Sequence, residues 1–155
     1  MNRCYCDRQK PYADCCGPAH QGIQAETPVA LMRSRFSAFS LNNKEYLLRT
    51  WHASTRPETL MLNPGCLWKS LKILSYQQSA SKSDVGGTGR VHFKAFFWEE
   101  GRWGYLEEKS NFVYEGRQWF YLDGDSAQAF FQPSRNEACP CGSGKKHKRC
   151  CLNYM

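Results

Sequence analysis

The chain has 155 residues, 9 cysteines and a formal net charge of +7. Its length suits one domain with small appendages, and its 41% hydrophobic content excludes a disordered chain. No apolar run approaches the about 18 residues that span a bilayer, and the first residues lack the apolar stretch of a signal peptide. We therefore expect a cytoplasmic protein without membrane attachment, whose thiols stay reduced.

Four cysteines lie close to the beginning of the chain. They are Cys4, Cys6, Cys15 and Cys16. Their spacing reads C-x-C, eight residues, then C-C. Two adjacent side chains converge most readily in the first turn of a short helix, so we expect such a turn at the second pair.

Two helices are predicted next. Thr27 is a suitable N-cap and Pro28 suits the first helical position, and apolar residues then recur at helical spacing. This pattern predicts a helix over about 28–40. A capping-box pattern that begins at Asn42 predicts a second helix through about Trp51.

After a short third piece bracketed by Pro57 and Pro64, the pattern becomes that of β-strands. The four predicted strands are 67–76, 90–98, 103–114 and 118–122. We interpret the polar, glycine-rich segment 79–89 as a mobile hairpin connection, and Asp123 with the following glycine as a turn. Helices followed by an antiparallel meander predict an α+β domain with the helices on one face of the sheet. A sheet bent around a helix would enclose a conical pocket.

Four more cysteines near the other end repeat the first spacing. They are Cys139, Cys141, Cys150 and Cys151. Between the two pairs, Gly142 and Gly144 supply the permissive backbone that a metal knuckle needs. The N-terminal copy lacks these glycines, so we expect its loop to differ. We interpret Cys66, the ninth cysteine, as a small buried hydrophobe.

Four thiolates that are close in sequence form the ligand set that Zn²⁺ prefers, because the ligands are soft and allow tetrahedral coordination. We expect one Zn²⁺ in each quartet and two per chain. Two alternatives stay open. Iron could occupy a four-cysteine site, and each quartet could instead form two disulfides, which would require an oxidising compartment.

From Cys139 to Cys151 the sequence resembles the SEC-C motif at nearly every position. That zinc knuckle closes the SecA preprotein translocase ATPase, where it contacts an export chaperone and the ribosome. SecA-type copies usually end in Cys-His, whereas this copy ends in Cys-Cys. The resemblance implies a protein or ribosomal partner for this chain. The basic residues that could make the contact are Lys145, Lys146, Lys148 and Arg149.

The whole chain also resembles the bacterial YchJ family. The matching stretches, besides both knuckles, are 31–39, 50–52, 108–112 and 118–124. The resemblance implies a central domain like that of nuclear transport factor two, with N-terminal helices packed on a curved antiparallel sheet, and it implies no established activity. The expected parts are an N-terminal divergent SEC-C knuckle (1–20), a cone-shaped α+β domain (25–131) and a C-terminal SEC-C knuckle (135–155).

A candidate catalytic site lies in the third predicted strand. Alternation places Glu108 on the same face as the apolar Phe112, so its carboxylate would point inward and would need a partner. A structural ion pair with Arg33 or Arg35 is the favoured interpretation. A general base formed by Glu108 with His52 is the alternative.

Three functions are consistent with these patterns. The favoured one is a non-enzymatic zinc-binding protein whose knuckles dock to a protein or ribosomal partner, with a central pocket of unknown ligand. The second is an RNA- or ribosome-binding module that uses the basic C-terminal knuckle. The third is a small-molecule enzyme that uses the central pocket. We expect no binding to DNA.

Overall fold

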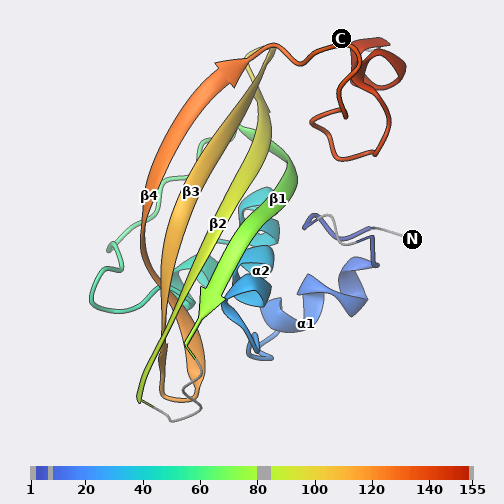
Figure 1. Ribbon diagram of the computed structural model, residues 1–155. Helices are drawn as coiled ribbons and strands as arrows, with labels where there is room; N and C mark the ends of the chain where they lie inside the picture. Colours follow the sequence, from blue (N-terminus) through green and yellow to red (C-terminus); the bar gives the residue numbers. More distant parts are fainter. Residues whose placement is uncertain (1–2, 7–8, 80–84, 154–155) are drawn as a thin grey trace.

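Four long strands form one antiparallel sheet in the order β1-β2-β3-β4 (Figure 1). They are β1 (Leu67–Gln78), β2 (Val85–Glu99), β3 (Arg102–Glu115) and β4 (Gln118–Phe131). The computed structural model describes residues 3–6, 9–79 and 85–153. Within these residues each strand pairs with the next one along the chain, so the sheet is a simple meander, as the sequence predicted.

Short helices precede and follow the sheet. The described α-helices are α1 (Cys16–His20), α2 (Pro28–Ser40) and α3 (Lys44–Arg49), and the 3-10 helices are η1 (Tyr12–Asp14), η2 (His147–Arg149) and η3 (Cys151–Asn153). None of the described helices is long and apolar enough to cross a membrane. The α+β class is therefore confirmed, with the helices before the sheet in the sequence.

Helix α2 begins and ends where the sequence predicted. The hydroxyl of Thr27 accepts a hydrogen bond of 3.0 Å from the backbone N–H of Ala30, which caps the first turn. Helix α3 is capped in the same way, because the Asn43 side chain accepts from the N–H of Tyr46 at 3.1 Å. Helix α3 ends at Arg49, slightly before the predicted end. The short third piece forms neither helix nor strand.

The core lies between α2 and one face of the sheet. Leu31, Met32 and Phe36 of α2 are buried there. Alternating residues of β2 are also buried: Val91, Phe93, Ala95 and Phe97. Figure 1 shows α2 lying against this face, whereas both ends of the chain lie on the right-hand side of the view.

The strands are longer than predicted. Strand β2 begins at Val85, so residues 85–89 belong to the sheet and not to a mobile connection; residues 80–84 of that segment lie outside the described residues. The glycines at 87 and 89 are needed within the ladder: a Cβ at Gly87 would lie 2.8 Å from Tyr114, and one at Gly89 would collide with Pro28.

The predicted turn at Asp123 is wrong. Strand β4 continues through this position to Phe131, with Gly124 opposite Ser110 of β3 and only a bulge nearby. A Cβ at Gly124 would lie 2.6 Å from a carboxylate oxygen of Glu108, so the glycine makes room for that side chain. Cross-strand pairing with β3 therefore outweighs the local turn preference.

Candidate metal centres

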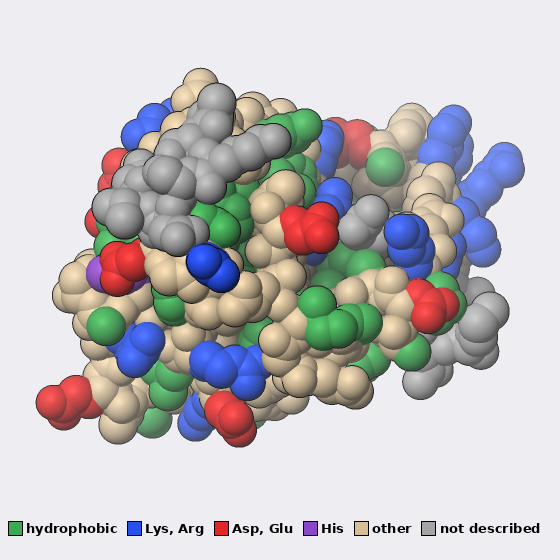
Figure 2. Space-filling model, turned by 90° about the horizontal axis from the view of Figure 1, so that it is seen from below, with side chains coloured by type: hydrophobic (Ala, Val, Ile, Leu, Met, Phe, Trp, Pro, Cys, Tyr) green, Lys and Arg blue, Asp and Glu red, His purple; other side chains and the backbone are tan. Residues whose placement is uncertain are grey.

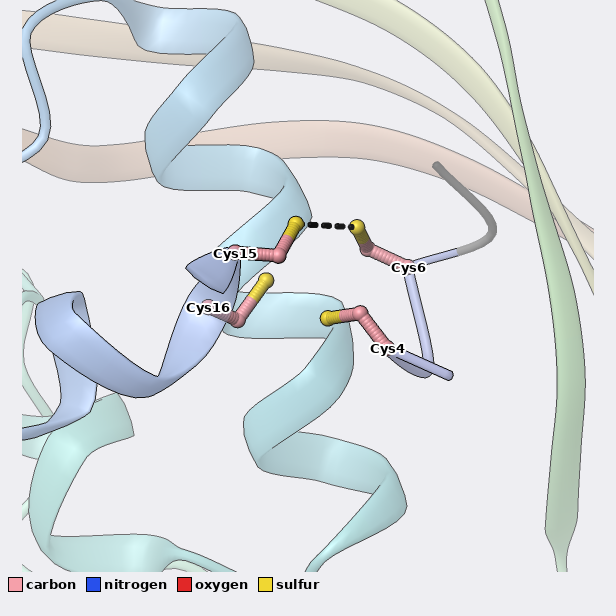
Figure 3. A group of neighbouring side chains, drawn as sticks. All are labelled: Cys4, Cys6, Cys15 and Cys16. Carbon is pink, nitrogen blue, oxygen red and sulfur yellow. Dashed lines mark hydrogen bonds between the residues drawn. The ribbon is translucent and has the colours of Figure 1, made fainter. Parts of the chain in front are cut away.

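The four N-terminal cysteines converge on one point. Figure 3 shows their side chains directed toward a common centre, and the four sulfurs all lie within 4.8 Å of one another. The Sγ atoms of Cys6 and Cys15 are 3.5 Å apart. Cys16 is the first residue of α1, so the adjacent pair does converge at the start of a short helix. The quartet could therefore hold one metal ion.

The C-terminal cysteines form a second quartet with the same arrangement. Its four sulfurs also lie within 4.8 Å of one another, and Cys141 and Cys150 are 3.5 Å apart. Cys151 is the first residue of η3, as Cys16 is of α1. Both ends of the chain thus gather four sulfurs, as their common spacing predicted.

The backbones of the two knuckles correspond. The N–H of Cys4 donates to the carbonyl of Lys10 at 2.7 Å, and the N–H of Cys139 donates to that of Lys145 at 2.8 Å. Gln9 has φ 59° where the C-terminal copy has Gly144 at φ 84°. The expectation of a different loop is thus wrong at Gln9, where a left-handed conformation persists without glycine; residues 7–8 lie outside the described residues.

The pKa values of the thiols within each quartet shift in opposite directions. A hydrogen bond with Ser143 lowers the pKa of Cys150 to about 7, whereas burial raises the pKa of Cys151. At the other end, hydrogen bonding with Cys16 lowers the pKa of Cys4. Four sulfurs this close cannot all ionise without repelling one another, so a metal ion would be needed to hold the fully ionised set.

The N-terminal quartet is embedded in the central domain. Cys4 Sγ lies 3.5 Å from the hydroxyl of Ser37 on α2, and Arg33 of the same helix donates to the carbonyl of Cys6 at 3.0 Å. Helix α1 is tied to α2 as well, because His20 donates through Nε2 to the carbonyl of Ser34 at 2.8 Å. Three of its four cysteines therefore belong to the same buried cluster as α2 and the sheet.

The C-terminal quartet is attached more loosely. The hydroxyl of Ser70 on β1 donates to the carbonyl of Pro140 at 2.6 Å. Within the knuckle, His147 is buried and its Nδ1 lies 3.4 Å from Cys139 Sγ, so it supports a ligand rather than replacing one. Of the four basic candidates for partner contact, Lys145, Lys146 and Arg149 are exposed and Lys148 is half-buried.

The predicted partners of Glu108 are wrong. Its carboxylate accepts hydrogen bonds from the hydroxyls of Ser110 and Tyr121. Arg35 instead donates to the Leu47 carbonyl at 2.8 Å and to Thr50 at 2.7 Å. Among the described residues, neither Arg33 nor Arg35 forms an ion pair with Glu108, although the charge of Glu108 contributes to the environment of Arg35.

His52 and Glu108 also lie apart. His52 Nε2 is 2.9 Å from a carboxylate oxygen of Glu115, and its backbone N–H donates to Tyr121 at 2.7 Å. That backbone bond places His52 beside Tyr121, which pairs with Phe112 of β3, and its ring reaches toward Glu115 at the turn end. Glu108 lies seven residues from Glu115 along the strand, about 23 Å at about 3.3 Å per residue. The structure therefore does not bring together the proposed general base pair.

Several contacts around the quartets could not be predicted from the sequence. Ser37 and Arg33 of α2 contact the N-terminal quartet, and Ser143 lies 3.2 Å from Cys150 Sγ. Only Ser143 had a sequence signal, since it lies between the two glycines of the knuckle. The others come from a neighbouring helix, whose approach no local pattern reveals.

The central domain and the C-terminal knuckle both match known families. Residues 27–124 match the family described as the YchJ middle NTF2-like domain, and residues 135–153 match the SEC-C motif. The fold and the cysteine quartets thus define an NTF2-like α+β protein that carries a SEC-C motif. The chain belongs to the YchJ family, and UPF0225 proteins are among its relatives.

Relatives and solved structures agree with this assignment. A UPF0225 protein of Vibrio cholerae serotype O1 is 42% identical over 153 residues, covering 96% of this chain and 98% of the relative. One from Shewanella sp. strain MR-4 is 38% identical over 158 residues, covering 96% and 95%.

Two solved structures of SEC-C motif containing proteins are similar to the chain. A crystal structure from Psychrobacter arcticus has a TM-score of 0.67 and 28% identity, covering 100% of this chain and 98% of the other. A solution structure from Rhodopseudomonas palustris has a TM-score of 0.69 and 27% identity, covering 81% and 99%.

Proposed function

We propose that the chain is a non-enzymatic zinc-binding protein that holds one Zn²⁺ in each cysteine quartet and docks to a protein or ribosomal partner through its C-terminal knuckle. The observation that carries the proposal is the convergence of two separate sets of four sulfurs, each within 4.8 Å. A zinc ion bound by four thiolates has no open position for substrate, so its contribution is to hold the knuckle folded.

The two quartets would serve different purposes. The N-terminal one packs on α2 and is mostly buried, which suits a structural role within the central domain. The C-terminal one lies at the edge of the molecule and carries exposed basic side chains. Figure 2 shows Lys and Arg side chains projecting from the right-hand side of the molecule, the side on which both chain ends lie in Figure 1.

RNA is the second candidate partner, because segment 135–151 has five basic residues against one acidic residue. Contacts between these side chains and phosphates would weaken steeply as salt rises. A contact with a folded protein would depend less on salt, since apolar surface would contribute to it.

Metal analysis tests the zinc proposal. Protein purified anaerobically should contain two zinc ions per chain by mass spectrometry of its metals, and Cys4→Ser or Cys139→Ser should each remove one. Protein that contains no metal, or iron in place of zinc, would contradict the assignment.

Partner capture tests the docking proposal. A variant with Glu at Lys145, Lys146, Lys148 and Arg149 should lose co-sedimentation with ribosomes or capture of its protein partner. The matched control places Glu at four basic positions on the strands that are exposed: Lys69, Lys72, Arg90 and Lys109. This control should retain the partner. If both variants retain the partner equally, the basic residues of the knuckle do not make the contact.

A further inference from the structure

A groove of about 460 Å³ separates the C-terminal knuckle from one end of the sheet. The hairpin between β2 and β3 contributes Trp98 and Trp103, and the end of β4 contributes Phe131. The knuckle contributes His147 and Leu152 to the opposite wall. The groove therefore exists only when the knuckle is folded beside the sheet.

The walls of the groove are apolar and partly open to solvent. Leu152 is 39% exposed and Phe130 is 37% exposed, although both are large hydrophobic residues. The rings of Trp98 and Trp103 pack edge to face with centroids 5.4 Å apart. Clustered apolar side chains that stay accessible typically mark a binding surface.

One arginine lies in the apolar lining of the groove. No carboxylate belongs to its described lining, whereas Arg102 does, with its guanidinium 3.7 Å from the Phe130 ring centre. Among the described residues Arg102 forms no ion pair with an acidic side chain. Of segment 145–149 only His147 belongs to the described lining, and the nearby Glu99 carboxylate accepts a hydrogen bond from Asn63. Arg102 therefore offers a positive group that an acidic side chain of a ligand would complement.

Trp103 also carries an unused hydrogen-bond donor. Its indole nitrogen is the one buried side-chain polar atom without a partner in the described chain, and the residue is 3% exposed. Buried donors are normally paired, so this wall of the groove is imperfectly satisfied, and its packing is free to adjust when a ligand binds.

We propose that this groove binds an extended segment of a partner protein in which apolar side chains alternate with acidic ones. The proposal rests on the docking function proposed above and specifies its site and the chemistry of its partner. A peptide fits better than RNA, because bases stack on open ring faces whereas Trp103 is almost fully covered and the remaining wall includes the aliphatic Leu152.

Fluorescence anisotropy of the zinc-loaded full chain tests the proposal. The probe is a labelled peptide that alternates Phe or Leu with Glu. The comparison probes are the same peptide with Lys for Glu, the same peptide with Ser for Phe and Leu, and a single-stranded RNA. We expect the first peptide to bind at least about tenfold more tightly than the others, since an unpaired charge or a lost apolar anchor costs this much. Tighter binding of the RNA, or no binding of the first peptide, would overturn the proposal.

Two variants locate the site. Leu152→Ser and Arg102→Glu should each weaken the first peptide about tenfold. Their matched controls are Leu41→Ser, which changes a leucine of similar exposure (41%) outside the groove, and Arg90→Glu, which changes another exposed arginine of the same sheet. The controls should bind as the wild type does. Equal affinity in all variants would place the peptide elsewhere.

The Trp103 indole signal in a nitrogen-15 spectrum, assigned with Trp103→Phe, should shift on adding the peptide. A signal that stays unchanged at saturation would overturn the role of the groove.

The zinc content distinguishes failure of the proposed function from failure of this inference. Protein without zinc would refute the proposed function, whereas protein that holds two zinc ions but does not bind the peptide would refute only this inference.

Discussion

The guanidinium carbon of Arg35 lies 4.5 Å from the ring centre of Tyr121, which joins α2 to β4 through the middle of the domain. Trp51 contributes a second ring at 5.4 Å. Arg35 is nearly completely buried, and burial lowers its pKa to about 10, so it stays charged at neutral pH. Rings and hydrogen bonds, rather than a direct ion pair, therefore accommodate this charge.

Replacing Arg35 with Met should destabilise the protein by about 3 kcal/mol, because the Leu47 carbonyl and the Thr50 hydroxyl lose a charged donor in a buried place. Urea unfolding followed by circular dichroism measures the effect. The control is Arg49→Met, since Arg49 is exposed and pairs with Glu45 only at 3.9 Å; it should cost less than about 1 kcal/mol. If both variants lose a similar free energy of unfolding, the buried contacts of Arg35 do not contribute more than the exposed ones of Arg49.

The two quartets should differ in their effect on the central domain. Cys16→Ser should lower the free energy of unfolding of the sheet by about 3 kcal/mol, because Cys16 belongs to the buried core and a lost metal site is among the costly changes. The equivalent Cys151→Ser should cost the sheet less than about 1 kcal/mol, since Cys151 lies outside that core. Near-ultraviolet circular dichroism in urea follows the sheet. Equal losses would show that both knuckles support the domain alike.

Cys66 should react slowly with iodoacetamide in metal-loaded protein. Burial raises the pKa of its thiol to about 11, so little thiolate is present at neutral pH, and the thiolate is the reactive form. The labelling rate should rise with pH toward that value. Mass spectrometry measures the modification, and Cys66→Ser identifies it. The structure places Cys66 in a half-buried position rather than the fully buried one that was predicted, and rapid labelling at neutral pH would contradict its raised pKa.

Acid should weaken the fold partly through Glu107. His92 Nε2 lies 2.7 Å from its carboxylate, and this hydrogen bond lowers the pKa of Glu107. A carboxyl whose pKa falls on folding stabilises the protein above its unfolded pKa, about 4.3, and this stabilisation disappears as the pH drops through the lowered value. The urea midpoints of wild type and Glu107→Gln should therefore converge in acid. The control is Glu26→Gln, at an exposed position. Its urea midpoint should differ from that of the wild type by the same amount at every pH.

The cysteine quartets and α2 could be predicted from the sequence because their determinants are local. The cysteines of each quartet are close along the chain, and their repeated spacing indicates a common structure. The N-cap at Thr27, the proline after it and the helical period lie within one segment, so the bounds of α2 were correct.

The tertiary structure alone decided how long the strands are and which side chains meet. Strand β4 continues past Asp123 because β3 supplies its hydrogen bonds, and His52 meets Glu115 rather than Glu108 because a backbone contact with β4 sets its place. The groove beside Trp103 likewise needs the knuckle and the sheet together. These features depend on contacts between segments distant in sequence, whose register and approach are set when the whole chain packs, so no local pattern encodes them.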